Sequence, residues 1–507
     1  MRVKASIYNS ISNVLILIFT TIMTFLTRTI FIQILGKECI GVDGLFTNIL
    51  TMLSVAELGL STAINFSLYE PLEKKDISKI NKIMSFYKKM YRYIGIIVFC
   101  VGIFLMLFLN IIVKDTTINN LHLIYFLYLL NTVIIYFVSY KDVLLAADQK
   151  YYKLNKLRNI FIFITYSLQC LFLVLTKNYV VYLIILLSCK FIERVLINRY
   201  ITKHYDKVDF NSTEKLEKKE VNKIFKNIKG MIFHKIGNYF LNSTDNILIS
   251  TLINIATVGI YSNYLAIISV FRNFISTFLS GITPSFGNLV VSTDNDVQER
   301  VFRIMSFLSY LIFGFVTVCF VNMLTPFINV WLGNEYVVDN ITTIVICINF
   351  YFYCLLIPID IVKNASGIYY VDRFIPIIQV IINLIASIIL TPYFGLLGIL
   401  LGTLLSYILV IIWSKPLIIY KYLFKKSVKE YYLKQIKNLF ILVIICVLTS
   451  IIIDLLSLKL CLLSLIIEGV ICFIIYFIII IIAYHKSEEY KLLLSVIKNL
   501  FNKEVEK

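Results

Sequence analysis

The sequence is poor in charge and in the two residues that interrupt helices. Only 15% of its 507 residues are charged, and it contains 18 glycines and 7 prolines. A soluble domain carries roughly 25% charged residues, which help to cover its apolar core. Here 59% of the residues are hydrophobic, and mean hydropathy is +0.85. These values exclude a soluble protein and predict an integral membrane protein.

Motifs for catalysis and metal binding are also missing. The ten cysteines form no Cys-x-x-Cys pair, and the four histidines are scattered. The stretch GITPSFGN (281–288) lacks the Lys-Ser/Thr of a phosphate loop. We therefore expect no disulfide, metal site, enzyme activity or ATP hydrolysis. Transport would be secondary, with no cofactor beyond a coupling ion, Na⁺ or H⁺, that the sequence does not identify.

Long apolar runs dominate the chain instead. A hydrocarbon core of about 30 Å needs roughly 20 apolar residues of helix. Runs of that length are too long and too uniformly apolar for membrane β-strands. The sequence predicts an all-α membrane protein with about fourteen transmembrane helices. These spans are 11–35, 41–69, 93–113, 121–147, 159–175, 179–200, 231–253, 256–282, 304–324, 341–362, 374–390, 396–420, 439–458 and 460–484.

Lys and Arg gather in alternate loops, which predicts the orientation of the chain. Cytoplasmic loops carry an excess of these residues. With the N-terminus inside, the inner segments hold 36 basic residues and the outer segments hold four: Lys37, Lys114, Lys177 and Lys459. Both termini are therefore expected in the cytoplasm. The net charge of +18 reflects this topology, with inner loops facing anionic lipid, so no nucleic-acid partner is expected.

No segment outside the spans is long enough for a separate domain, the longest being 325–340 outside and 201–230 inside. The predicted parts are a six-helix N-terminal lobe (1–200), a cytoplasmic connector (201–230), a six-helix C-terminal lobe (231–420), and two further transmembrane helices with a tail (421–507). The tail has an apolar helical face, which suits the inner membrane interface or a cap on the basic loops. This face consists of Leu493, Val496, Ile497, Leu500 and Phe501.

Ionisable residues lie deep within four predicted spans: Arg28, Glu57, Asp245 and Arg272. Such groups usually face a cavity or a partner. The span with Asp245 also carries His234, Asn238 and Asn242 at helical spacing. Polar side chains of this kind can also serve only as hydrogen bonds between helices. We interpret the charged residues as lining a water-filled cavity.

The starts of the second and eighth spans are similar, which predicts an internal repeat. IGVDGLFTNIL (40–50) aligns with VGIYSNYLAII (258–268) when Gly41 is placed on Gly259, a shift of 218. Six-helix repeats around a binding site are a common transporter plan, so we predict two lobes with pseudo-twofold symmetry. A further glycine-rich stretch, FGLLGILLG (394–402), predicts close helix packing.

The same shift places charged residues in comparable positions. Arg28 falls beside Asp245, and Glu57 falls near Arg272. By helical rise, Arg28 and Asp245 lie about 12–13 Å below the outer helix ends, and the other two lie about 20–24 Å below. Pairing lowers the cost of buried charge. We predict that Arg28 approaches Asp245 and that Glu57 approaches Arg272 when substrate is absent.

Residues 28–76 read RTIFIQILGKECIGVDGLFTNILTMLSVAELGLSTAINFSLYEPLEKKD. The arginine in the first helix, the ILG-x-E turn, the G-x-x-G-L-F start, the AELGLS run and the SLY-x-P end together resemble the Wzx-type oligosaccharide-lipid flippases. These form the polysaccharide transporter family of the MATE-like (MOP) superfamily. Fourteen spans, inner termini and two lobes extend the resemblance along the chain. It implies a bacterial plasma-membrane protein that works by alternating access through a cavity between its lobes.

By this resemblance, the protein would move undecaprenyl-pyrophosphate-linked oligosaccharide from the inner to the outer leaflet for capsule, exopolysaccharide or O-antigen-like glycan assembly. The implied partners are this substrate, membrane lipid, and the polymerase and glycosyltransferases of a glycan cluster. Arg28 and Arg272 would meet the pyrophosphate, because guanidinium groups bind phosphate oxygens in pairs and stay protonated. The remaining predicted cavity residues are Glu57, Asp245, Asn238 and Asn242.

Two other functions stay open at this point. One is a cation-coupled exporter of drugs or small molecules, as in the multidrug branch of the same superfamily. Glu57 and Asp245 favour it, whereas fourteen spans and the two arginines argue against it. The other is a membrane enzyme, a polysaccharide polymerase or glycan ligase. Such enzymes usually carry a large outer loop, and the sequence lacks one.

Overall fold

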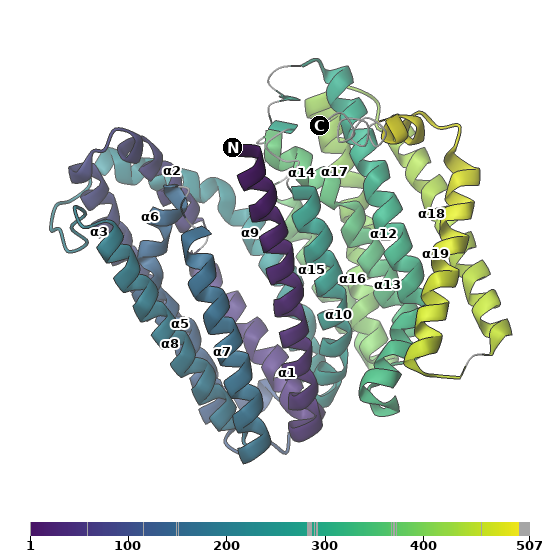
Figure 1. Cartoon of the computed structure of the whole chain (residues 1–507), viewed down its shortest axis with the longest axis horizontal. Helices are drawn as coiled ribbons and strands as arrows, with labels where there is room; N and C mark the ends of the chain where they lie inside the picture. Colours follow the sequence, from purple (N-terminus) through teal and green to yellow (C-terminus); the bar gives the residue numbers. More distant parts are fainter. Residues whose placement is uncertain are drawn as a thin grey trace. The chain divides into compact units, whose positions relative to one another are not determined.

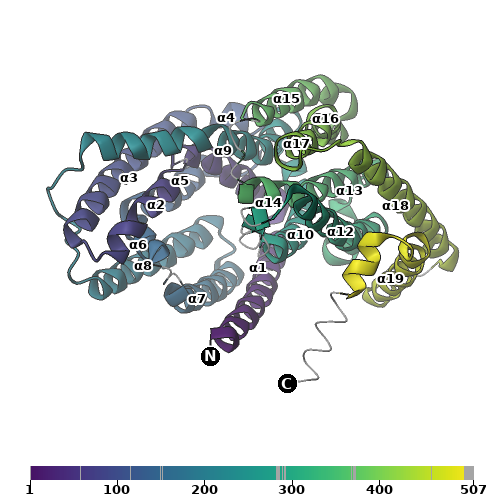
Figure 2. The same ribbon diagram turned by 90° about the horizontal axis from the view of Figure 1, so that it is seen from above.

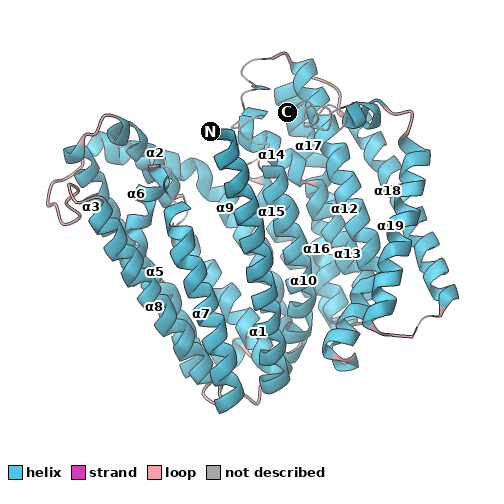
Figure 3. Ribbon diagram, in the orientation of Figure 1, coloured by secondary structure: helices cyan, strands magenta, loops and turns pink. Residues whose placement is uncertain are grey.

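The chain is all-helical in the part that the structure describes. The computed structural model describes residues 2–57, 59–114, 116–148, 150, 152–280, 286–287, 289–290, 293–366, 368, 371, 373–457 and 459–495. Within these ranges there is no strand (Figure 3). Eleven of the helices are long and apolar enough to cross a membrane. The predicted class, an all-α integral membrane protein, is confirmed.

The eleven helices and the fourteen predicted spans differ in number but cover similar parts of the chain. Helix α1 contains the first span and the first part of the second. The sixth span lies on α8, which carries five charged residues, and the seventh lies on α9, which is polar for much of its length. These two helices are therefore absent from the eleven. The count of fourteen stays a prediction.

The chain divides into two compact units, residues 1–262 and 263–507. In the first unit, α3 packs on α5, α5 on α8, α8 on α7, and α7 on α1 (Figure 1). Its elements are α1 (Arg2–Leu53), η1 (Ser54–Glu57), α2 (Leu60–Glu73), α3 (Ile77–Met106), α4 (Leu109–Ile112), α5 (Leu121–Val138), η2 (Ser139–Lys141), α6 (Asp142–Ala147), α7 (Tyr152–Thr176), α8 (Tyr179–His204), α9 (Lys218–Leu252) and the first residues of α10 (Ile255–Ser280).

Helix α1 is interrupted at Gly36. This residue has φ 79° and ψ −177°, a conformation in which a side chain would clash. The helical hydrogen bonds cannot continue through it, so α1 consists of two segments, 2–35 and 37–53. These segments correspond to the first predicted span and the first part of the second.

The connector after α8 folds back onto α3. Ser85 Oγ donates a hydrogen bond to the carbonyl oxygen of Ser212 at 2.6 Å. Lys88 Nζ donates to Asn211 Oδ1 at 2.5 Å. These bonds fasten the start of the predicted connector to the first unit, which continues through α9. The four-part organisation of the chain stays a prediction.

The second unit contains the rest of α10 and the remaining helices. These are α12 (Asn295–Leu332), η3 (Asn334–Tyr336), α13 (Asn340–Leu355), α14 (Ile357–Ser366), α15 (Ile375–Phe394), α16 (Leu396–Ser406), the π-helical turn η4 (Tyr407–Ile411), α17 (Ile412–Ile419), the π-helical turn η5 (Tyr420–Phe424), α18 (Lys429–Leu456) and α19 (Leu462–Tyr484).

Helices α15 and α16 pack through glycines. A Cβ atom on Gly402 would lie 2.2 Å from Ser387 Oγ, and one on Gly398 would lie 2.5 Å from the Leu390 carbonyl oxygen. Asn383 Nδ2 donates to Thr403 Oγ1 at 2.9 Å across the same interface. The close packing predicted for FGLLGILLG is confirmed.

Helices α18 and α19 pack against α12 (Figure 2). The phenol of Tyr476 reaches the backbone of α12 and donates to the Leu311 carbonyl oxygen at 3.0 Å. A Cβ on Gly314 would lie 2.6 Å from the Tyr476 hydroxyl oxygen, so a glycine is needed there. A hydrogen-bonded tyrosine in a buried apolar cluster thus holds α19 against α12.

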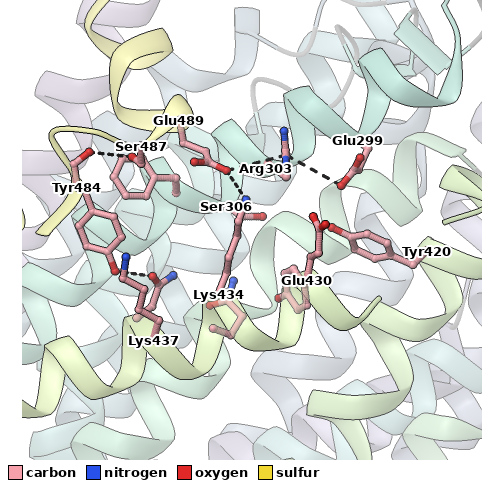
Figure 4. Close-up of a pocket in the computed structure, with 14 residues that line it drawn as sticks. Glu299, Arg303, Ser306, Tyr420, Glu430, Lys434, Lys437, Tyr484, Ser487 and Glu489 are labelled. Atoms are coloured by element: carbon pink, nitrogen blue, oxygen red, sulfur yellow. Dashed lines mark hydrogen bonds and ion pairs between the residues drawn. The ribbon is translucent and has the colours of Figure 1, made fainter. Parts of the chain in front are cut away.

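The segment after α19 is helical over 488–495 and is held by charged side chains. Lys434 Nζ lies 2.7 Å from Glu489 Oε1, and Arg303 Nη2 lies 3.1 Å from Glu488 Oε2. Figure 4 shows Glu489 pointing toward Arg303 and Lys434 at a small pocket. The predicted amphipathic tail stays a prediction, because only Leu493 of its apolar face lies within the described residues.

Candidate transport site

Arg28 lies in the first segment of α1 and is partly exposed. Asp43, in the second segment, is a carboxylate whose charge acts on it. Arg28 precedes the break at Gly36 by eight residues, and Asp43 follows it by seven. At about 1.5 Å per residue, both lie about 10–12 Å from the break. The two charges therefore lie at matching heights.

A network of side chains from three helices holds Asp43. The Tyr128 hydroxyl of α5 donates to Asp43 Oδ1. The Tyr128 and Tyr179 hydroxyl oxygens are 3.0 Å apart. The Tyr179 ring of α8 meets Phe31 of α1 edge to face, with centroids 5.1 Å apart. Because α1, α5 and α8 all contribute, the position of the Asp43 carboxylate is fixed by side chains of three helices.

Glu57 lies at the end of η1 and belongs to a different hydrogen-bonded cluster. Ser61 Oγ donates to Glu57 Oε1 at 2.5 Å, and the Tyr91 hydroxyl also donates to it. The hydroxyl oxygens of Ser61 and Tyr87 lie 2.8 Å apart. This cluster connects η1, α2 and α3 and gives the carboxylate partners within the first unit.

Asp245 lies on α9 and is partly buried, between the buried residues Thr244 and Asn246. The side chains of Asn238 and Asn242, like that of His234, lie outside the described part of the structure. The polar stripe that these residues form on the sequence therefore stays a prediction.

Arg272 lies on α10 within the second unit. Its guanidinium carbon is 3.3 Å from the centroid of the Tyr353 ring on α13. Tyr407, the first residue of η4, is close enough for its hydroxyl to act on the Arg272 charge. A cation over an aromatic face is attracted by the ring quadrupole. Tyr353 therefore fixes the position of this guanidinium.

Asp43 and Tyr353 were not among the site residues predicted from the sequence. The position of Asp43 was available, because it mirrors Arg28 across Gly36. Tyr353 carries no comparable signal, since it is one of 34 tyrosines and its contact depends on the packing of α10 with α13. The predicted pairings of Arg28 with Asp245 and of Glu57 with Arg272 stay predictions.

The side chains at Arg28 and Arg272 suit the binding of anions. Guanidinium groups present N–H donors in a planar fork that matches phosphate or carboxylate oxygens. Among the described residues, no group of three or more His, Cys, Asp or Glu side chains is placed to hold a metal ion. The arrangement supports recognition of an anionic group within membrane-spanning helices.

Residues 6–290 match the family described as "Polysaccharide biosynthesis protein". No curated protein matches the sequence. Among solved structures, "Lipid II flippase MurJ, inward closed conformation" is similar at 14% identity, with a TM-score of 0.69 over 94% of this chain and 99% of that one.

Structures of multidrug transporters are also similar. The "inward-facing conformation of a multidrug resistance MATE family transporter of the MOP superfamily" has 12% identity and a TM-score of 0.63, over 78% of this chain and 93% of that one. A point mutant of the Vibrio cholerae MATE transporter VcmN has 12% identity and a TM-score of 0.50, over 76% of this chain and 94% of that one. At these identities the likeness shows a shared fold.

Proposed function

Because the chain belongs to the polysaccharide biosynthesis protein family, we propose that it is a flippase for undecaprenyl-pyrophosphate-linked oligosaccharide. It moves this substrate from the inner to the outer leaflet of the bacterial plasma membrane by alternating access, with both termini in the cytoplasm. The glycan serves capsule, exopolysaccharide or O-antigen-like assembly. Glycosyltransferases supply the substrate and a polymerase uses it.

One observation carries this proposal: each unit holds an arginine within its membrane-spanning helices, near side chains of the same unit that interact with its charge. The charge of Arg28 interacts with that of Asp43, and Arg272 lies over the ring of Tyr353. A guanidinium at the bilayer centre costs roughly 2.5–3.5 kcal/mol on translocon scales. Two such arginines are costly, so we infer that they have a function within the membrane, such as binding an anion.

The negative charge of the proposed substrate explains why the protein would need these arginines. A lipid-linked pyrophosphate carries about two negative charges, and moving a charge through hydrocarbon is costly. Arginine forms paired hydrogen bonds with phosphate oxygens and keeps its charge at all physiological pH values. Two arginines within the membrane-spanning helices therefore lower the cost of bringing the head group through the protein while the isoprenoid chain stays in lipid.

A cation-coupled exporter is the second candidate, and Asp43 is the observation that favours it. A carboxylate that accepts a hydrogen bond from Tyr128 within membrane helices can bind and release a proton or a cation. An exporter predicts that Asp43→Asn abolishes ion-driven drug efflux. A flippase predicts that drug resistance is unchanged in a deletion strain.

The test is a leaflet-resolved assay of lipid-linked oligosaccharide in a deletion strain that carries plasmid-borne variants. Arg28→Ala and Arg272→Ala should abolish outward movement at normal protein level, and Arg28→Lys should restore only part of it. Tyr353→Phe keeps the ring and should retain most activity. Tyr353→Leu should lose about 5–30-fold, from a cation–π contribution of about 1–2 kcal/mol.

Matched controls come from exposed residues of the same types. Arg199→Ala on α8 and Tyr393→Leu on α15 should behave as the unmodified protein. Normal export by Arg28→Ala together with Arg272→Ala would overturn the proposal, because the two cations would then have no role in moving the substrate.

A further inference from the structure

An open pocket lies at one end of the first unit, where three loops meet. It has a volume of about 590 Å³ and is lined by residues of 35–39, 117–120 and 177–180, with Ile124. Volumes of about 300–1,000 Å³ are typical of small-molecule sites. Arg28 and Asp43 do not line it, so it is separate from the candidate transport site.

Two of the lining residues, Lys37 and Lys177, are cations. The predicted topology leaves only four basic residues on the outer side, and this pocket contains two of them. Lys177 has φ 49°, in the left-handed region that lysine rarely adopts. Two of the four predicted outer lysines therefore lie at the same pocket, and Lys177 does so in an unfavourable backbone conformation.

The acidic lining residue, Glu38, has a structural partner. Its Oε2 accepts hydrogen bonds from the backbone nitrogen and the hydroxyl of Thr117, both at 2.9 Å. This bond ties the loop before α5 to the break in α1. The charged side chains that line the pocket are therefore two lysines and one carboxylate, and Thr117 engages that carboxylate.

Two helices begin at this pocket, which adds further positive potential. At the start of α8, Asn178 Oδ1 accepts from the Val180 nitrogen at 2.8 Å. At the start of α5, the Asn120 side chain makes no capping hydrogen bond. The first helical bond of α5 runs from Ile124 to Asn120, so earlier N–H groups have no partner within the helix.

From these observations we propose that this pocket binds the phosphate group of a sugar phosphate. Two amines and a helix N-terminus are suited to a phosphate. The amides of Asn119, Asn120 and Asn178 offer donors and acceptors for sugar hydroxyls. The predicted topology places the pocket on the outer face. The proposal concerns a second site and does not depend on the proposed flippase function.

The test uses the full chain purified in neutral detergent without phosphate. Binding of radiolabelled inorganic phosphate is measured by equilibrium dialysis, with chloride at matched ionic strength as background. Glucose 1-phosphate should compete more strongly than inorganic phosphate, and glucose should not compete. Ligand at ten times its Kd should also raise Tm by about 1–2 °C.

Variants assign the binding to this pocket. Lys37→Gln combined with Lys177→Gln should weaken phosphate binding at least ten-fold, and Lys177→Glu alone should weaken it more than Lys177→Gln. Lys177 is exposed, so its variants keep the test valid even if the Lys37 variant folds poorly. Lys459→Gln and Lys114→Gln, the other two outer lysines, serve as controls and should bind normally.

Three results would overturn the proposal. The first is binding that is unchanged in the double variant and in Lys177→Glu. The second is competition by chloride as effective as that by phosphate. The third is competition by phosphatidic acid in neutral-lipid nanodiscs without competition by glucose 1-phosphate, which would assign the site to a lipid head group.

Discussion

Gly41 and Gly259 contact each other in a reciprocal arrangement. A Cβ on Gly41 would lie 2.1 Å from the Ile255 carbonyl oxygen, and one on Gly259 would lie 2.0 Å from the Lys37 carbonyl oxygen. Residues 37 and 255 are 218 apart, as are 41 and 259. Reciprocal contact between equivalent residues is what a twofold axis produces. The contact supports the internal repeat at the positions from which it was predicted.

The contact predicts the effect of small substitutions. Gly41→Ala and Gly259→Ala should each lower the free energy of unfolding by about 1–3 kcal/mol, because the added methyl group overlaps a backbone oxygen. Gly469→Ala on α19 is the control, since its Cβ would lie 3.5 Å from the Met323 side chain. It should be neutral or stabilising. Thermal unfolding in detergent measures all three, and equal stability of Gly41→Ala and Gly469→Ala would contradict the prediction.

Much of the fold was predictable because membrane helices have a strong sequence signal. Length and hydropathy located the helices, and glycine positions indicated where helices approach closely. The break at Gly36 matched the end of the first apolar run. Helix boundaries near the membrane surface were less predictable, since α3 begins at Ile77, well before the apolar run at 93. Its first part is held by the connector, a contact that no local pattern reveals.

The candidate site was predictable only in part. Depth in a hydrophobic run identified Arg28, Glu57, Asp245 and Arg272, but their partners depend on tertiary packing. The same limit applies to Asp142, whose Oδ2 lies 2.8 Å from Arg158 Nη2 and 3.0 Å from Arg194 Nη1. These residues belong to three helices, so their spacing in the sequence does not indicate that they meet.

The environment of Arg28 predicts a double-mutant result. Removing one partner of a charge pair leaves the other charge without compensation, and because Arg28 is partly exposed we expect a cost below the roughly 3–5 kcal/mol of a fully buried pair. Asp43→Asn and Arg28→Gln should each lower protein stability, and the double variant should be more stable than either alone. Export should stay absent in both variants that lack Arg28. Thermal unfolding and the leaflet assay measure the two effects separately.

The same cycle with Asp245→Asn tests the pairing predicted from the repeat. If Arg28 pairs with Asp245 in the absence of substrate, the coupling energy with Asp245 should be comparable to that with Asp43. Charge exchange, Arg28→Asp with Asp245→Arg, should then restore protein level more than activity. A coupling energy near zero, and no crosslink between cysteines at 28 and 245, would rule this pair out.

Glu489 predicts a pH dependence of stability outside the membrane. Burial acts to raise the pKa of Glu489, but the hydrogen bond from Lys434 and the charges of Lys434 and Arg303 outweigh it, so this pKa is lowered. A lowered pKa contributes stability above the unfolded value of about 4.3 and loses it as the pH falls through the folded value. The Tm difference between the unmodified protein and Glu489→Gln should therefore be largest at pH 5–7 and shrink toward pH 3.

A control separates this effect from general acid denaturation. Glu73, at the end of α2, is exposed. Glu73→Gln should change Tm less than Glu489→Gln does over the same pH range. A constant difference for Glu489→Gln across the same range would mean that its ion pairs contribute nothing to stability.

The proposed substrate charge predicts that export responds to membrane potential. Moving one charge across 100 mV changes the free energy by roughly 2.3 kcal/mol, so a pyrophosphate with about two negative charges gains roughly 4–5 kcal/mol when it moves outward from an inside-negative compartment. Arg28 and Arg272 belong to the protein and return with it, so they do not cancel this charge over a full cycle.

Proteoliposomes with a fluorescent lipid pyrophosphate, a potassium gradient and valinomycin should show outward accumulation that rises with inside-negative potential. The lipid monophosphate, with less charge, is the matched control and should respond less. Export that is independent of potential for both lipids would mean that cations accompany the substrate, and that Na⁺ or H⁺ coupling must then supply the driving force.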